Sequence, residues 1–149
     1  MVHDELIKRA REAHKQGELP VAEGLYRQVL AGDPDDPDAN LLLGVIHYQR
    51  DEYHPALELI RKADRLRPGH PATLNNLGSV QKAFGLHDDA LASLLKAIDL
   101  DPGFGEAHNN LGTVYAKLGR LDEAEAAYKA AVANRPDYIK AINNLGNLC

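Results

Sequence analysis

Small and apolar residues recur along this chain with a period of 34 residues. Alanines, prolines and glycines each occupy one register of the period, namely Ala22, Ala56, Ala90 and Ala124; Pro34, Pro68, Pro102 and Pro136; and Gly44, Gly78, Gly112 and Gly146. A constant spacing of this size is typical of stacked supersecondary units, because one helix pair cannot bury its own apolar face and needs that of its neighbour. The frame divides the chain into repeats 3–36, 37–70, 71–104 and 105–138, followed by a fragment, 139–149.

Each repeat carries the pattern of two helices. In repeat 105–138, Leu111, Gly112 and Tyr115 fall on one face at helical spacing, and Gly119 follows where a left-handed residue is needed to end the first helix. The same ending is expected at Gly17, at Gly85 and, with aspartate in place of glycine, at Asp51.

The second helix of repeat 105–138 is expected to begin with Asp122 as its N-cap. Ala124, Tyr128 and Ala131 form its packing stripe, and Pro136 stops it. The repeat therefore reads as an antiparallel helix pair.

These residues resemble the tetratricopeptide repeat family. Leu111-Gly112-(x2)-Tyr115, followed by Ala124, Tyr128, Ala131 and Pro136, matches the pattern of that family position by position. The resemblance implies an all-α fold, a right-handed α-solenoid of stacked antiparallel helix pairs. The first repeat departs most, with Arg9 and Ala10 where Leu and Gly are usual, and its outer face is expected to be a polar end.

Helical geometry separates two faces of the first helix in each repeat. With positions numbered from the first residue of a repeat, positions 4, 7, 8 and 11 face the second helix, and positions 2, 5, 6, 9, 12 and 13 lie opposite, on what the family uses as a concave groove. We expect the ligand-binding residues there, from the third repeat onward. They are Asn75, Asn76, Ser79, Lys82, Asn109, Asn110, Thr113, Lys117, Lys140, Asn143, Asn144 and Asn147.

Positions 5 and 6 form a double row of amides, the asparagine ladder: Asn75, Asn76, Asn109, Asn110, Asn143 and Asn144. An amide offers an acceptor and two donor hydrogens, so it can hold the backbone of an extended peptide without reading its side chains. The ladder resembles the asparagine array in the repeats of O-linked N-acetylglucosamine transferases, which implies binding of extended polypeptide. The alternative is that these asparagines only solvate a helix surface.

The predicted groove is basic, although the chain carries a net charge of −5. Six basic residues (Lys8, Arg11, Lys15, Lys82, Lys117 and Lys140) outnumber three acidic ones (Asp4, Asp38 and Glu106). This favours acidic or carboxylate-bearing partners through steering, and solvated charges without that role are the alternative. The carboxylate clamp of chaperone-binding relatives is not expected, because Asn75, Ser79 and Asn144 do not match its pattern.

Composition argues against nucleic acid as a partner, against insertion into a membrane and against secretion. The acidic balance argues against general affinity for nucleic acid, and no apolar run reaches membrane-spanning length. The first five residues, MVHDE, lack the basic start and apolar stretch of a secretory signal, and the lone Cys149 cannot form an internal disulfide. We therefore expect a cytoplasmic protein.

No catalytic, cofactor or metal site is predicted. The stretch 103–105, Gly-Phe-Gly, lacks the third glycine of a nucleotide loop, and Ser93 and Lys96 are interpreted as ordinary surface in mid-helix. The acidic loop 33–38 has Pro37 where calcium would need a ligand. His47 and His108 fall at packing positions, and we expect them to be buried or half-buried in the core.

The sequence favours a protein interaction module that binds an extended peptide or a partner helix. One alternative is the substrate-recognition segment of a larger glycosyltransferase, sulfotransferase or methyltransferase, since residues 139–149 supply only the first helix of a fifth repeat. Another is a self-assembling scaffold, because Leu145 and Leu148 are expected to leave an apolar C-terminal end exposed.

Overall fold

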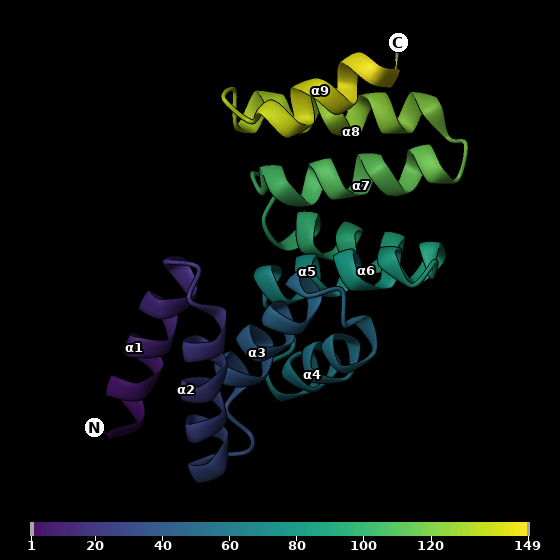
Figure 1. Ribbon diagram of the computed structural model, residues 1–149. Coiled ribbons are helices and arrows are strands. Elements are labelled where there is room, and N and C mark those ends of the chain that lie inside the picture. The colour runs from purple at the N-terminus through teal and green to yellow at the C-terminus, as the bar shows by residue number, and fades with distance from the viewer. Residues whose placement is uncertain (1, 149) are drawn as a thin grey trace. The chain divides into compact units, whose positions relative to one another are not determined.

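The computed structural model describes residues 2–148, and that range folds into helices without a strand (Figure 1). The all-α class predicted from the sequence is confirmed. The chain divides into two compact units, Met1–Pro68 and Gly69–Cys149, which we call the N-terminal unit and the C-terminal unit. No helix in the described range is both long and apolar enough to cross a membrane.

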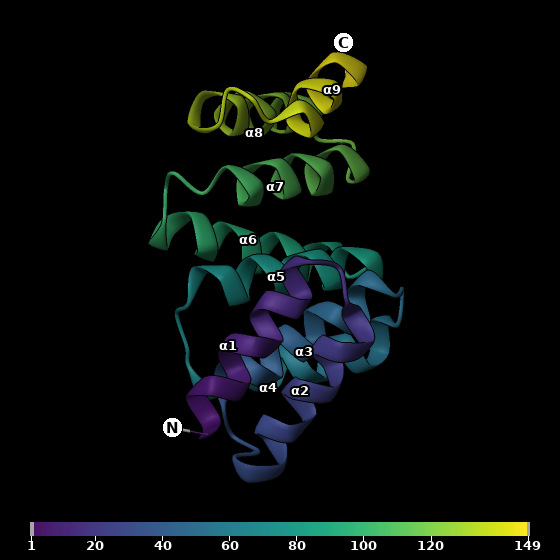
Figure 2. The same cartoon turned by 60° about the vertical axis from the view of Figure 1, so that its left-hand side comes forward.

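The N-terminal unit contains two antiparallel helix pairs. Its helices are α1 (Val2–Lys15), α2 (Leu19–Gly32), α3 (Pro37–Gln49) and α4 (Tyr53–Leu66). The C-terminal unit contains two further pairs and one single helix, and its helices follow one another through the stack in chain order (Figure 2). They are α5 (Pro71–Ala83), α6 (His87–Leu100), α7 (Gly105–Lys117), α8 (Leu121–Asn134) and α9 (Ile139–Leu148).

The first helix of each pair ends in a left-handed residue, as the sequence predicts. Positive φ angles occur at Gly17 (80°), Asp51 (61°), Gly85 (78°) and Gly119 (76°). At the end of α7 this turn lets the Arg120 N–H donate to the Tyr115 carbonyl oxygen at 2.9 Å, which satisfies an acceptor that the helix leaves open. These reversals are short, so the two helices of a pair lie against each other.

The predicted N-cap at Asp122 is wrong. Helix α8 begins at Leu121 with Arg120 as its N-cap, and no side chain caps it. Asp122 lies in the first turn instead, where a carboxylate is stabilised by the positive end of the helix dipole. A side-chain cap does occur on α3, where Asp36 accepts the Ala39 N–H at 2.7 Å.

A close approach at position 8 holds the helices of a pair together. A Cβ atom built on Gly112 would lie 2.6 Å from the Tyr128 ring. Equivalent atoms on Gly44 and Gly78 would lie 2.7 Å from Ile60 Cγ1 and 2.6 Å from Leu94 Cγ. Glycine is therefore required at position 8 because the residue at position 24 occupies the space of its side chain.

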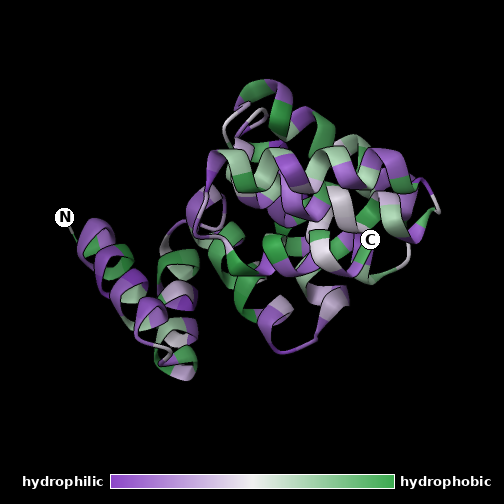
Figure 3. Ribbon diagram, turned by 90° about the horizontal axis from the view of Figure 1, so that it is seen from above, coloured by the Kyte–Doolittle hydropathy of each residue, from purple (hydrophilic) through white to green (hydrophobic). Residues whose placement is uncertain are grey.

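In the first repeat the residue at position 8 is alanine, so a methyl group faces the second helix there. Ala10 occupies position 8 there and Tyr26 occupies position 24, and both side chains are fully buried. Burial raises the pKa of the Tyr26 hydroxyl to about 12, since the phenolate would be poorly solvated. Figure 3 shows hydrophobic and hydrophilic residues interleaved along the helices, so apolar side chains are available for such packing within a polar chain.

The apolar C-terminal end differs from the prediction. Leu145 and Leu148 are half-buried and pack against the core of the C-terminal unit, so they are not the exposed residues. The exposed apolar side chains of α9 are Ile139 and Ile142, which keep 69% and 43% of their surface accessible. The helix turns its leucines toward α7 and α8, which is why the isoleucines face outward.

Replacing Gly112 with alanine should lower the free energy of unfolding by about 1–3 kcal/mol, because the new methyl group would overlap the rigid Tyr128 ring. The matched control is Gly24→Ala in α2, where an added Cβ meets nothing within 4 Å. That substitution should stabilise the protein by about 0.5–1 kcal/mol. Urea unfolding measures both changes, and equal midpoints for the two variants would contradict the packing contact.

Candidate functional site

The predicted binding residues lie on α5, α7 and α9, and α7 contacts both other helices. The amides differ widely in exposure. Asn75, Asn109 and Asn110 are buried, with 2%, 1% and 7% of their surface accessible. Asn76 and Asn144 are half-buried, whereas Asn143 and Asn147 are exposed.

Amide-to-amide hydrogen bonds join the successive first helices of the C-terminal unit. Asn110 Nδ2 donates to Asn75 Oδ1 at 2.9 Å, and Asn144 Nδ2 donates to Asn109 Oδ1 at 2.9 Å. Each bond runs from position 6 of one repeat to position 5 of the preceding repeat. Sequence reasoning placed both rows toward a ligand, but the buried part of the ladder connects one helix to the next.

Hydroxyl groups at position 9 complete this polar layer. Asn110 Nδ2 also donates to Ser79 Oγ at 3.1 Å, and Ser79 Oγ in turn donates to the Asn75 carbonyl oxygen. Thr113 Oγ1 donates to the Asn109 carbonyl oxygen at 3.1 Å and accepts the Tyr128 hydroxyl at 3.2 Å. Buried polar groups are thus paired with one another, which offsets the cost of removing them from water.

The acceptor atoms of position 6 are the part of the ladder that remains for a ligand. Within residues 2–148, no hydrogen bond reaches the Oδ1 atoms of Asn76, Asn110 or Asn144. Asn76 Nδ2 donates to the Ala72 carbonyl oxygen of its own helix at 3.0 Å. A peptide N–H could therefore be accepted at three successive positions.

Three lysines gather on the same three helices: Lys82 on α5, Lys117 on α7 and Lys140 on α9. Burial lowers the pKa of Lys82, and the positive charges of Lys140 and then Lys117 lower it further. In the described part of the chain no carboxylate forms an ion pair with any of the three. We call this group the lysine cluster, and like charges held together in this way favour an anion between them.

The predicted groove charges of the N-terminal unit do not form a cluster like that of the three lysines. In the N-terminal unit, Asp38 accepts both Arg11, at 3.3 Å, and Arg67, at 2.8 Å, so these charges are locally compensated. Lys8 and Lys15 are exposed to solvent. The uncompensated positive charge of the predicted groove is therefore best developed in the C-terminal unit.

The sequence profile of the tetratricopeptide repeat family matches residues 7–71 and 75–139. The chain belongs to this family. No curated protein matches the sequence. The helix pairs described above are those that the resemblance implies.

Solved structures with the same fold include YrrB, which is described as a tetratricopeptide repeat protein, as well as MamA and an O-GlcNAc transferase. MamA is 26% identical with a TM-score of 0.79, over 93% of this chain and 81% of its own. YrrB, described as having an unusual peptide-binding site, is 26% identical with a TM-score of 0.77, over 96% and 74%. A mutant O-GlcNAc transferase from Thermobaculum terrenum is 28% identical with a TM-score of 0.84, over 89% of this chain and 26% of that one.

Ser93 is not the ordinary surface residue that the sequence suggests, whereas the two core histidines are placed as predicted. Ser93 is 8% exposed, and its Oγ donates to Gln81 Oε1 at 2.7 Å, between α6 and α5. His47 is 9% exposed and lies 3.2 Å from Glu52 Oε1, while His108 is half-buried beside the Pro102 carbonyl oxygen. Both histidines therefore lie in or at the core.

The acidic loop 33–38 lies beside His3, a neighbour that the sequence did not predict. His3, Asp33 and Asp36 each offer a ligand atom, all within 4.8 Å of one another. His3 Nε2 and Asp36 Oδ2 are 2.8 Å apart, and Asp36 also caps α3. This hydrogen bond accounts for the approach and ties α1 to the start of α3.

Replacing Asn110 with alanine should lower the free energy of unfolding by about 1–3 kcal/mol, because the buried Oδ1 of Asn75 would lose its donor. Asn76→Ala is the matched control, since its amide bonds only within its own helix. That change should stay within about 0.5 kcal/mol of the parent protein. Urea unfolding distinguishes them, and an unchanged Asn110→Ala midpoint would contradict the amide-to-amide bond.

Proposed function

We propose that the C-terminal unit is a protein interaction module that binds an extended, acidic polypeptide along α5, α7 and α9. The supporting observation is the juxtaposition of the three open Oδ1 acceptors with the lysine cluster on the same helices. The acceptors hold the backbone of the polypeptide and the lysines attract its carboxylates. The chain itself performs no catalysis in this proposal.

The spacing of the helices suits an extended ligand. Packed helices lie about 8–10 Å apart, and an extended chain advances about 3.3 Å per residue. One ladder acceptor is therefore available for roughly every third residue of the ligand. The hydrogen bonds from Asn110 to Asn75 and from Asn144 to Asn109 hold these acceptors in place before the ligand arrives, which reduces the entropy lost on binding.

The lysine cluster favours acidic ligands, a preference that contacts to the ligand backbone alone would not produce. Lys82 is the most buried of its members, and its pKa is already lowered by burial and by its neighbours. A ligand carboxylate would relieve that repulsion, so acidic segments are favoured over neutral ones.

The similarity to a region of an O-GlcNAc transferase supports a second candidate function. In this proposal the same groove presents a substrate polypeptide to a catalytic domain that lies outside this chain of 149 residues. The binding chemistry is unchanged, and the ligand becomes a substrate. Expression of the chain beside its neighbouring sequence, with an assay for modification of the bound polypeptide, separates the two candidates.

Asn76→Ala should weaken binding of extended peptides about two- to tenfold, the effect of one lost hydrogen bond. The loss should be similar for peptides of different sequence, because backbone contacts carry no side-chain information. Asn134→Ala is the matched control: its amide also donates to the carbonyl oxygen four residues earlier, but it lies on α8 outside the groove. Fluorescence anisotropy with labelled acidic and neutral peptides measures each affinity.

Two results of that experiment would count against the proposal. Equal affinities for the Asn76→Ala and Asn134→Ala variants would show that the ladder solvates a helix surface. A loss confined to one peptide sequence would mean that the groove reads side chains instead of the backbone.

Binding of an acidic peptide should weaken as the pH rises into the alkaline range. The pKa of Lys82 is lowered in the free protein, and a bound carboxylate would raise it, so binding takes up protons. The affinity for the peptide is then highest below the pKa that Lys82 has in the free protein, and it falls as the pH rises through that pKa. Lys82→Arg keeps its charge over this range and should flatten the profile, whereas identical profiles for the two proteins would exclude a carboxylate at Lys82.

A further inference from the structure

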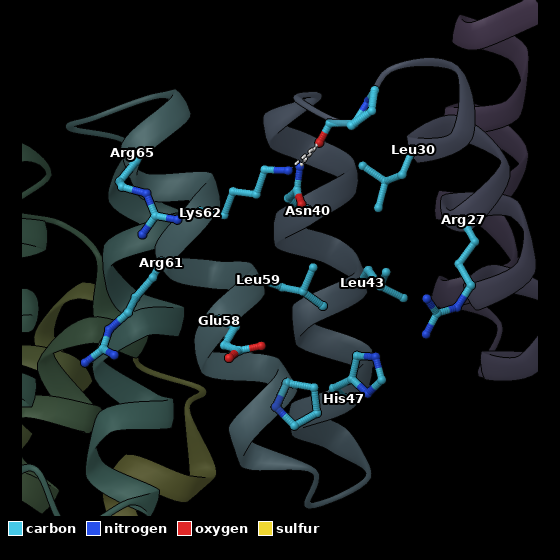
Figure 4. A pocket seen from close by; sticks show the side chains of 12 residues that line it. Arg27, Leu30, Asn40, Leu43, His47, Glu58, Leu59, Arg61, Lys62 and Arg65 are labelled. Carbon is cyan, nitrogen blue, oxygen red and sulfur yellow. Dashed lines mark hydrogen bonds between the residues drawn. The ribbon is translucent and has the colours of Figure 1, made fainter.

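The N-terminal unit contains a groove that is lined only by residues of that unit. Residues from α2, α3 and α4 line an open groove of about 790 Å³ (Figure 4). Figure 4 shows Leu30, Leu43 and Leu59 lying between Arg27 on one side and Arg61 and Arg65 on the other. The groove thus has an apolar centre and a charged border.

The apolar centre belongs to the core of the unit. Leu43 is 1% exposed, and Leu30 and Leu59 are half-buried against the same cluster of apolar side chains. Leu43 therefore closes the bottom of the groove, and Leu30 and Leu59 are the leucines that offer aliphatic surface to a ligand side chain. Leu59 packs closely against Gly44, whose added Cβ would lie 3.2 Å from Leu59 Cβ.

Basic side chains outnumber acidic ones along the border of the groove. Four cations (Arg27, Arg61, Lys62 and Arg65) line it, against the single carboxylate of Glu58. Glu58 lies 3.3 Å from His54 Nε2. Arg27 pairs with Glu23 at 3.5 Å, and Lys62 Nζ lies 3.5 Å from Asp35 Oδ1 and donates to the Pro34 carbonyl oxygen at 2.9 Å. No carboxylate in residues 2–148 pairs with Arg61 or Arg65, which are four residues apart and so share one face of α4.

The polar groups inside the groove already have partners. Asn40 Nδ2 donates to the carbonyl oxygens of Pro34 and Asp36, at 3.0 and 2.8 Å. His47 Nδ1 lies 3.2 Å from Glu52 Oε1. The chemistry left for a ligand is therefore apolar contact with the leucines and ion pairing with the arginines.

We propose that this groove docks an acidic amphipathic segment of a partner protein. Aliphatic side chains of the segment pack on Leu30 and Leu59, and carboxylates one helical turn apart pair with Arg61 and Arg65. The charge complementarity comes from the basic residues of this groove, since the chain as a whole carries a net charge of −5. The site is independent of the ladder, so the chain carries two docking surfaces.

The test uses a labelled peptide of leucine, glutamate and alanine, with leucines and glutamates spaced three and four residues apart. Fluorescence anisotropy on the full chain should give saturable binding. Arg61→Glu with Arg65→Glu should weaken it by roughly tenfold or more, mainly through slower association. Arg9→Glu with Lys96→Glu changes the net charge by the same amount at exposed positions outside the groove, and should leave affinity within about twofold.

Two peptide controls leave the protein untouched. Replacing the glutamates of the peptide with glutamine, or its leucines with serine, should each abolish saturable binding, since one change removes the ion pairs and the other the apolar contact. Circular dichroism checks that both double variants keep their helix content.

Asn76→Ala should bind this peptide as the parent protein does, which distinguishes this site from the ladder.

Several results would overturn the proposal. These are absence of saturable binding by the parent protein, equal loss in the two double variants, or binding that survives the leucine-to-serine change. Sedimentation of the protein alone supplies another: self-association that is lost in Arg61→Glu with Arg65→Glu would make a second copy of this chain the occupant.

Discussion

The contact between position 8 of the first helix and position 24 of the second is the constraint on which the rest of this protein depends. Glycine at position 8 lets the Tyr128, Leu94 and Ile60 side chains reach the backbone of the facing helix. A helix held this closely cannot rotate about its axis without a clash. Its opposite face, which carries positions 5, 6 and 9, is therefore fixed as well, and so are the polar groups on it.

In the proposed function the asparagine ladder serves both the fold and a ligand. An amide in a nearly buried position destabilises the protein unless its polar atoms find partners. Position 6 supplies a donor to position 5 of the preceding repeat, as Asn110 does for Asn75 and Asn144 for Asn109. The acceptor atoms at position 6 are then available along the helices, so the hydrogen bonds that join the repeats also set the spacing of the proposed site.

The sequence predicts the features that depend on one repeat. Spacing within 34 residues is enough to predict the period and the helix pairs. It also predicts the left-handed residues at Gly119 and Asp51 and the small residue at position 8 that faces the second helix. It does not predict relations between repeats, because burial of Asn75 depends on a partner 35 residues away. It also misplaces the N-cap of α8, which is Arg120, and no side chain caps that helix. The basic groove is missed because its lining comes from three helices of two repeats.

Local charge, and not net charge, decides which partners this chain can attract. The net charge of −5 would suggest a weak attraction for acidic ligands, yet both proposed surfaces are basic. Charges separated by more than about 8 Å are largely screened at physiological ionic strength, so a ligand in either groove responds to the cations beside it. Acidic residues elsewhere, such as Asp38 with Arg67 and Glu123 with Arg120, are held in ion pairs. Pairing of this kind leaves the unpaired lysines and arginines as the charges that a partner meets first.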